Sequence, residues 1–134
     1  MTRPIIILFY FTMAVLSGAV GDGLNNVGIQ TWGHVLEGLE IALIFWGVYL
    51  LDEDKVLKWY EVLVMFITYI CLRFAFFDYA YNLAAENELT YLSDRNFWGQ
   101  LWLNVLKAPP HGIVWARLVF LVVGVSLPMR YLRD

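Results

Sequence analysis

A histidine and two carboxylates stand at the head of an apolar stretch and are the residues best suited to chemistry. The string GHVLEGLE places His34, Glu37 and Glu40 three residues apart, directly before IALIFWGVYLL. On a helix, three residues fall about 60° short of a full turn, so these side chains lie within an arc of ~120° and can face one interior. Such groups can exchange protons, bind a cation or form ion pairs. Because an ionised side chain facing lipid costs several kcal/mol, we predict that they face inward.

The elements that position these residues are predicted to be membrane-spanning helices. Of the 134 residues, 60% are hydrophobic and 16% are charged, so the chain carries more apolar surface than a small soluble core could hide. Four apolar segments come close to the ~20 residues that a spanning helix needs; they are residues 4–20, 31–51, 59–83 and 111–129. The sequence therefore predicts an all-α membrane protein with a single domain over residues 1–134, in which four transmembrane helices form a compact bundle.

The distribution of basic residues predicts the orientation. If the helices alternate in direction, one side of the membrane receives Arg3, Lys55, Lys58, Arg130 and Arg133. On the opposite side, the loop GDGLNNVGIQ has no Lys or Arg. Cytoplasmic loops carry an excess of these residues. We therefore expect both termini in the cytoplasm, and the bacterial inner membrane or an equivalent membrane as the location.

The loop before the fourth span contains a predicted short helix at about residues 94–106. Asp94 can cap its first turn. Apolar side chains then recur at intervals of three to four residues, which is typical of one apolar helix face; they are Trp98, Leu101, Trp102, Val105 and Leu106. We expect this amphipathic helix to lie along the membrane interface.

Polar residues of the other spans are predicted to reach the depth of the GHVLEGLE string. The predicted cluster, in the outer half of the membrane, consists of His34, Glu37, Glu40, Arg73, Asp78, Tyr81, Asn82, His111 and Arg117. Arg73 and Arg117 are the natural partners of its three carboxylates. The one negative charge left over predicts a proton on a carboxyl, a charged histidine or a bound cation. Glu61, near the cytoplasmic start of the third span, is expected to be separate and solvated.

The third span also resembles a known pattern. The string LRFAFFDYAYNL, followed by LTYLSD, is similar to an Arg-x4-Asp-x2-aromatic-Asn pattern with a tyrosine-containing turn in uncharacterised small membrane proteins of bacteria and their phages. Arg73, Asp78, Tyr81 and Asn82 match this pattern, whereas Leu92 stands where a glycine is expected. The resemblance implies that these four residues are important, and it implies no activity.

The cluster is open to several functional interpretations. The leading one is that it binds or passes an ion, a proton or a small polar solute. Alternatively, its ion pairs hold helices together in a structural or assembly subunit of a larger membrane complex. A third interpretation is a metal or haem site, with His34, Glu37, Asp78 and His111 as candidate ligands. The resemblance adds a fourth, a phage-encoded pore or lysis protein.

Composition and motifs limit the partners and the chemistry. The formal net charge is −3, and no basic stripe is present, so nucleic acid is not an expected partner. The expected partners are the lipid bilayer and either further copies of the chain or a larger membrane complex. No motif for nucleophilic or nucleotide chemistry occurs. The sequence therefore leaves an enzymatic activity and the identity of any cofactor undecided.

Overall fold

The computed structural model describes residues 2–52, 57–89, 91–92, 97–107 and 110–132. Over these residues the chain is helical, with α1 (Arg3–Asn26), α2 (Gln30–Asp52), α3 (Trp59–Ala84), the short α4 (Phe97–Gln100) that continues as a π-helical segment (Leu101–Leu106), and α5 (Pro110–Tyr131). Helices α1, α2, α3 and α5 are long and apolar enough to cross a membrane. The prediction of an all-α chain with four helices of this kind is confirmed.

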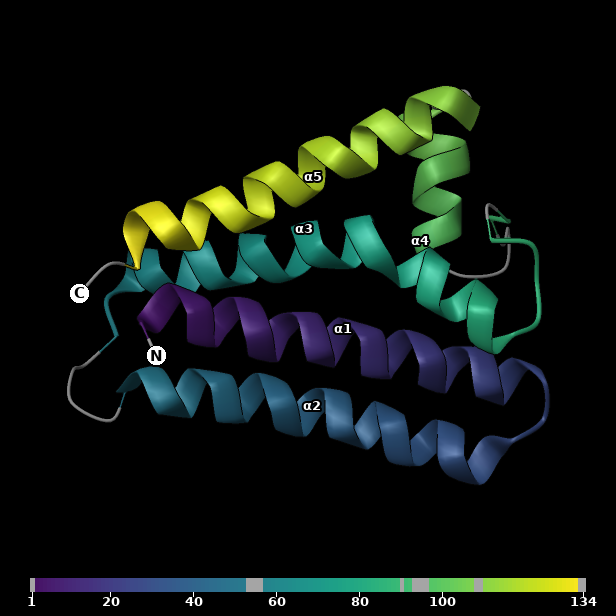
Figure 1. The fold of residues 1–134 in the computed structure, drawn as a ribbon, viewed down its shortest axis with the longest axis horizontal. Coiled ribbons are helices and arrows are strands. Elements are labelled where there is room, and N and C mark those ends of the chain that lie inside the picture. The colour runs from purple at the N-terminus through teal and green to yellow at the C-terminus, as the bar shows by residue number, and fades with distance from the viewer. Residues whose placement is uncertain (1, 53–56, 90, 93–96, 108–109, 133–134) are drawn as a thin grey trace.

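The four long helices lie side by side in the order α2, α1, α3, α5 (Figure 1). The beginning of α1 and the end of α5 lie at the same end of the molecule, which we call the terminal end. The α1–α2 connection, residues 27–29, lies at the opposite end together with α4; we call this the far end. The alternating direction of the helices therefore places the GHVLEGLE string near the far end.

Helix α1 is the central element because its small residues let two neighbours approach closely. A Cβ added at Gly21 would lie 2.8 Å from the backbone oxygen of Gly33 in α2, and one at Gly23 would lie 2.7 Å from the backbone oxygen of Tyr81 in α3. The sequence predicts that the first span ends at residue 20 and that these glycines form a turn. This boundary is wrong, since the close packing that they permit outweighs the ~1 kcal/mol that glycine costs a helix.

The compact bundle expected from the sequence differs from the observed row. Helix α3 packs against α1 and α5, and α1 packs against α2 and α3 with a smaller contact to α5. Helices α2 and α5 form the two edges in Figure 1. The outer face of α2 leaves Trp32, Phe45 and Tyr49 exposed. Such apolar faces need no protein cover in a bilayer, where lipid tails are as apolar as the side chains themselves. Burial of apolar surface therefore does not force the row to close into a bundle.

The predicted interfacial helix is present only in part, and its apolar residues do not share one face. Asp94 and the side chains of Trp98 and Leu106 lie outside the described residues. Trp102 is only 1% exposed, whereas Val105 is 67% exposed. A π-helix has a wider turn than an α-helix, so a spacing of three residues no longer keeps two side chains on the same face. Trp102 packs edge to face against Phe74 and Phe120, where it contacts protein rather than lipid headgroups.

Candidate functional site

The centre of the candidate site is Glu40, halfway along α2. Its carboxylate accepts hydrogen bonds from the hydroxyl of Tyr69 and the guanidinium of Arg73, both in α3. Arg73 also donates to the Tyr69 oxygen at 2.8 Å. The side chains of the ion pair are only 13% and 14% exposed. The Glu40 carboxylate fills the space beside Gly18, where any larger residue would collide with it.

A second polar group lies closer to the far end, around Glu37. One Glu37 oxygen accepts a hydrogen bond from the side-chain amide of Asn25, and the other lies 3.0 Å from Nδ1 of His34. The carboxyl of Asp22 lies close to the Glu37 carboxyl and interacts with it electrostatically. Two carboxyl groups can share a hydrogen bond only when one of them is protonated, since an ionised carboxylate has no proton to donate.

The two groups form one continuous polar row between α1, α2 and α3. We define this polar row as His34, Glu37, Asp22, Glu40, Tyr69 and Arg73. Asp22 links its halves, because it contacts Glu37 and interacts electrostatically with both Glu40 and Arg73. The row holds three carboxyl groups and one guanidinium. With every carboxyl ionised it would carry two excess negative charges, or one if His34 were also protonated.

Arg117 and Asp78 form a separate site between α5 and α3. An Nη atom of Arg117 donates to Asp78 at 2.6 Å, and its other Nη donates to the backbone oxygen of Phe74 at 3.0 Å. The guanidinium carbon lies 4.7 Å from the ring centre of Tyr79 and 5.0 Å from that of Trp102. Both side chains of the pair are almost fully buried. One cation faces one carboxylate, so this site is balanced in charge.

The predicted cluster is therefore divided, and its remaining members lie elsewhere. Asn82 donates to the backbone oxygens of Leu89 and Tyr91 and so fastens the segment that follows α3. Tyr81 stacks on Phe77. His111 belongs to α5, but its side chain lies outside the described residues. The division arises because Arg73 and Asp78 are five residues apart on α3, which separates them by ~140° around the helix axis.

Glu61 differs from its predicted state. The sequence predicts a solvated side chain, but Glu61 is buried and forms an ion pair with Arg3 at 2.9 Å. Its second oxygen accepts the backbone N–H of Lys58 at 2.8 Å. The interpretation of Glu61 as solvated is wrong because α1 and α3 begin side by side at the terminal end, where Arg3 covers the carboxylate.

Sequence reasoning missed three members or neighbours of the polar row. Asp22 and Asn25 fall in the stretch predicted to be a loop, yet α1 continues through it and directs both side chains toward Glu37. Tyr69 reads as an ordinary aromatic residue of an apolar span. A usable signal was present in the sequence: Gly18, Asp22 and Asn25 are spaced by four and three residues and therefore share one helix face.

The candidate metal ligands predicted from the sequence are distributed over different parts of the structure. Across the part of the chain that the structure describes, no three His, Cys, Asp or Glu side chains are grouped as metal ligands. Of the candidate ligands, His34 and Glu37 lie together on α2, whereas Asp78 is engaged by Arg117 on the other side of α3. The α2 and α5 helices, which carry the two histidines, form opposite edges of the row (Figure 1).

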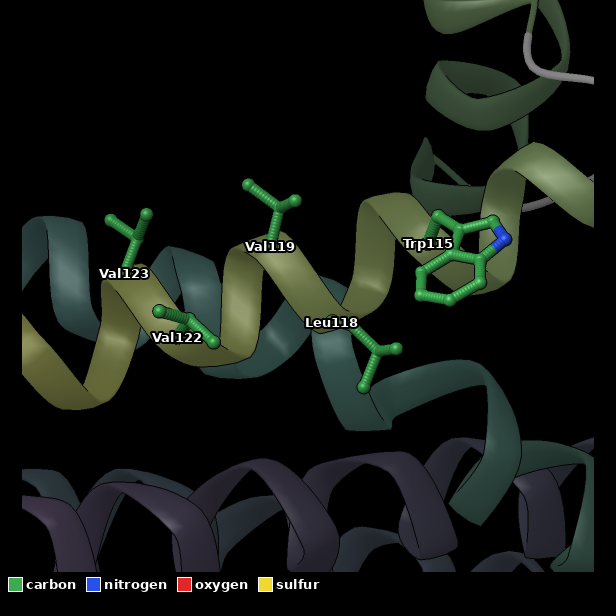
Figure 2. A pocket seen from close by; sticks show the side chains of 5 residues that line it. All are labelled: Trp115, Leu118, Val119, Val122 and Val123. Carbon is green, nitrogen blue, oxygen red and sulfur yellow. The ribbon is translucent and has the colours of Figure 1, made fainter.

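Two apolar hollows lie on the helices that carry the polar sites. A cavity of about 240 Å³ borders Tyr69 on the side of the terminal end, and its lining includes Phe11, Ile44, Val48 and Met65. The outer side of α5 carries a shallow pocket lined by apolar side chains alone, as Figure 2 shows; they are Trp115, Leu118, Val119, Val122 and Val123. The cavity and the pocket would both face acyl chains in a bilayer.

By length and composition, four helices of this chain are suited to crossing a membrane, which is compatible with an integral membrane protein of the polytopic class. The particular family is not identified, since no protein-family model, curated protein or solved structure matches the chain. The resemblance of the third span to small membrane proteins of bacteria and phages stays a prediction.

Proposed function

We propose that the polar row binds a proton or a small cation that enters from the far end. The observation that carries this proposal is the excess of carboxyl groups over Arg73. Uncompensated negative charge is costly inside a membrane, and a bound proton or cation reduces it. A neutral polar solute would leave the excess unchanged. The charge balance therefore favours a cationic ligand, and the closeness of the Asp22 and Glu37 carboxyl groups favours the proton.

The arrangement along α2 supports entry from one end. The His34 side chain is 69% exposed, whereas Glu40 lies ten residues after the start of α2, which corresponds to a depth of ~15 Å. Glu37 and Asp22 lie between them. Beyond Tyr69 the described lining is apolar. We therefore infer that a single chain binds its ligand from one side and does not form a complete path across the membrane.

Asp22 is the carboxyl that we propose to hold the proton. Both oxygens of Glu37 already have partners in Asn25 and His34, which favours an ionised Glu37 that only accepts hydrogen bonds. Asp22 then supplies the proton to the bond between the two carboxyl groups. Replacement of Asp22 by asparagine would keep a donor toward Glu37 while removing the titratable group, so the variant should still fold.

Infrared spectroscopy tests the assignment. Wild-type protein in lipid should show the C=O band of a protonated carboxyl, with the isotope shift expected in heavy water, and its intensity should change with the pH of the medium. Asp22→Asn should remove most of this band. Glu88→Gln, which alters an exposed carboxyl beyond the end of α3, should leave it unchanged. A wild-type spectrum without the band would contradict proton binding, as would a band that Asp22→Asn does not reduce.

A second candidate function is structural. Three Arg–carboxylate pairs each join a different pair of neighbouring helices: Arg3–Glu61 joins α1 to α3, Arg73–Glu40 joins α3 to α2, and Arg117–Asp78 joins α5 to α3. Such pairs would suit a subunit whose task is to hold its shape within a larger complex. A protonated carboxyl whose proton does not exchange with the medium would favour this structural function over ligand binding.

The proposed orientation places the terminal end in the cytoplasm, as in a bacterial inner membrane. Arg3, Lys58 and Arg130 all lie toward this end, which supports the orientation through the preference of cytoplasmic segments for basic residues. A tag fused after residue 134 is expected to resist protease added to intact spheroplasts and to be cleaved once the membrane is opened. Cleavage in intact spheroplasts would reverse the proposed orientation.

A further inference from the structure

The hydroxyl of Tyr69 is held in one orientation by its two polar partners. It donates its single hydrogen to Oε1 of Glu40 and accepts a hydrogen bond from Nη1 of Arg73 at 2.8 Å. Because a guanidinium has no acceptor, the Tyr69 hydrogen cannot go to Arg73 and is directed to the carboxylate. The three side chains therefore form a closed triangle of hydrogen bonds, in which Tyr69 is the member without charge.

The ring of Tyr69 fixes the position of this hydroxyl. It packs edge to face against Phe11, with 5.8 Å between the ring centres, and Phe11 is itself buried. The same ring borders the apolar cavity of about 240 Å³, so Tyr69 lies at the boundary between the polar row and this cavity. Replacing Tyr69 by phenylalanine would keep the ring contacts and remove only the hydroxyl. The role of Tyr69 in the polar row can therefore be separated from its role in packing.

Glu40 differs from the other two carboxyl groups of the row in the donors that it receives. Its Oε1 accepts from both Tyr69 and Arg73, and hydrogen bonds donated to a carboxylate favour its ionised form. Asp22 and Glu37 instead lie close to each other, which disfavours the ionisation of both at once. The titratable and charged groups around Glu40 come from all three helices of the row; they are Asp22, His34, Glu37, Tyr69 and Arg73.

We propose that Tyr69 is a positioning residue that, together with Arg73, keeps Glu40 ionised and so confines the proton of the row to Asp22 and Glu37. The charge of Glu40 then attracts a proton or a cation from the far end along the row, while Glu40 does not take up the proton itself. This inference deepens the proposed function by assigning the residue that regulates where the ligand is held. It rests on the proposed function for the proton at Asp22.

Loss of the hydroxyl should make Glu40 a competing site for the proton. In Tyr69→Phe, Oε1 of Glu40 keeps only the guanidinium as a donor, and hydrogen bonds to charged groups are stronger than those between neutral groups. We therefore expect Glu40 to bind a proton at a proton concentration at least about tenfold lower than when the hydroxyl is present. A purely structural role of Tyr69 would lower the stability of the protein without this change in protonation.

Infrared titration in lipid measures this change in a background where Asp22 cannot contribute. The C=O band of a protonated carboxyl is compared between Asp22→Asn and Asp22→Asn/Tyr69→Phe over a range of pH. The band should appear in the second variant at a pH at least about one unit higher, and adding Glu40→Gln should remove it. Asp22→Asn/Tyr49→Phe, which removes the hydroxyl of an exposed tyrosine of α2, is the matched control and should behave as Asp22→Asn does.

The outcomes separate the role of Tyr69 from the proton site at Asp22. An unchanged titration in Asp22→Asn/Tyr69→Phe would overturn the role of Tyr69, as would a new band that survives Glu40→Gln, and the wild-type band would still support the proton site. A wild-type spectrum without the band would remove the proton site, whereas a Glu40-dependent band in Asp22→Asn/Tyr69→Phe would still support Tyr69. If that variant does not fold, Tyr69→Phe alone serves, since its band should gain a component that Glu40→Gln removes.

Discussion

Replacing Arg117 by leucine is expected to lower the free energy of unfolding by about 3–5 kcal/mol, because it leaves the Asp78 carboxylate buried without a cation. Asp78 has Arg117 as its ion-pair partner at 2.6 Å, and both side chains are almost fully buried. The change also removes the donor to the Phe74 oxygen and the cation between Tyr79 and Trp102. Reversible unfolding in mixed micelles of mild and denaturing detergent would measure the loss.

The double variant Arg117→Leu/Asp78→Leu is the matched control for this prediction. It removes both charges, and a buried pair can often be replaced by apolar residues of similar size at little cost. We therefore expect the double variant to be more stable than Arg117→Leu alone, which is unusual for a second substitution in a buried site. If the losses in unfolding free energy caused by the two substitutions simply added, the Asp78–Arg117 interaction would not be what stabilises the contact between α3 and α5.

The helices of the fold could be predicted because the membrane imposes a simple length requirement. A spanning helix needs ~20 apolar residues, and segments such as 59–83 meet this requirement in the sequence alone. The order of the helices could not be predicted in the same way. Packing within a bilayer depends on where small residues allow close approach of two helices. The glycines at positions 21 and 23 provide such an approach, but in the sequence alone they also fit a turn, and a turn is predicted there.

The candidate site was predictable in its residue types and less so in its geometry. Hydropathy marks Glu40, Arg73, Asp78 and Arg117 as polar residues inside apolar spans. Their assignment to one cluster required the phase of each helix relative to its neighbours. On α3, Arg73 faces α2 while Asp78 faces α5, so two sites result. Asp22 was not predicted to belong to the site, because α1 continues beyond the predicted end of the first span.

Replacing Arg73 by alanine is expected to be as destabilising as the change at Arg117, about 3–5 kcal/mol, because Glu40 would lose its cation near the middle of the membrane. Arg73 also lies 4.3 Å from the ring centre of Phe77, and this contact would be lost too. The same detergent titration measures the effect. An unchanged unfolding midpoint would contradict the interpretation of Arg73 as the charge partner of Glu40.

The double variant Arg73→Ala/Glu40→Gln has a different expected result from the double variant at Arg117. Removing Glu40's charge should recover part of the lost stability, but Asp22 and Glu37 remain without the nearby guanidinium. With a single proton between them, these two carboxyl groups carry one negative charge, which is the same excess as in the wild type, but this charge has lost the attraction of the nearby guanidinium. We therefore expect incomplete recovery here and near-complete recovery at Arg117. Equal recovery at both sites would mean that Asp22 and Glu37 do not share the charge balance of Arg73, and the polar row would be two independent groups rather than one binding site.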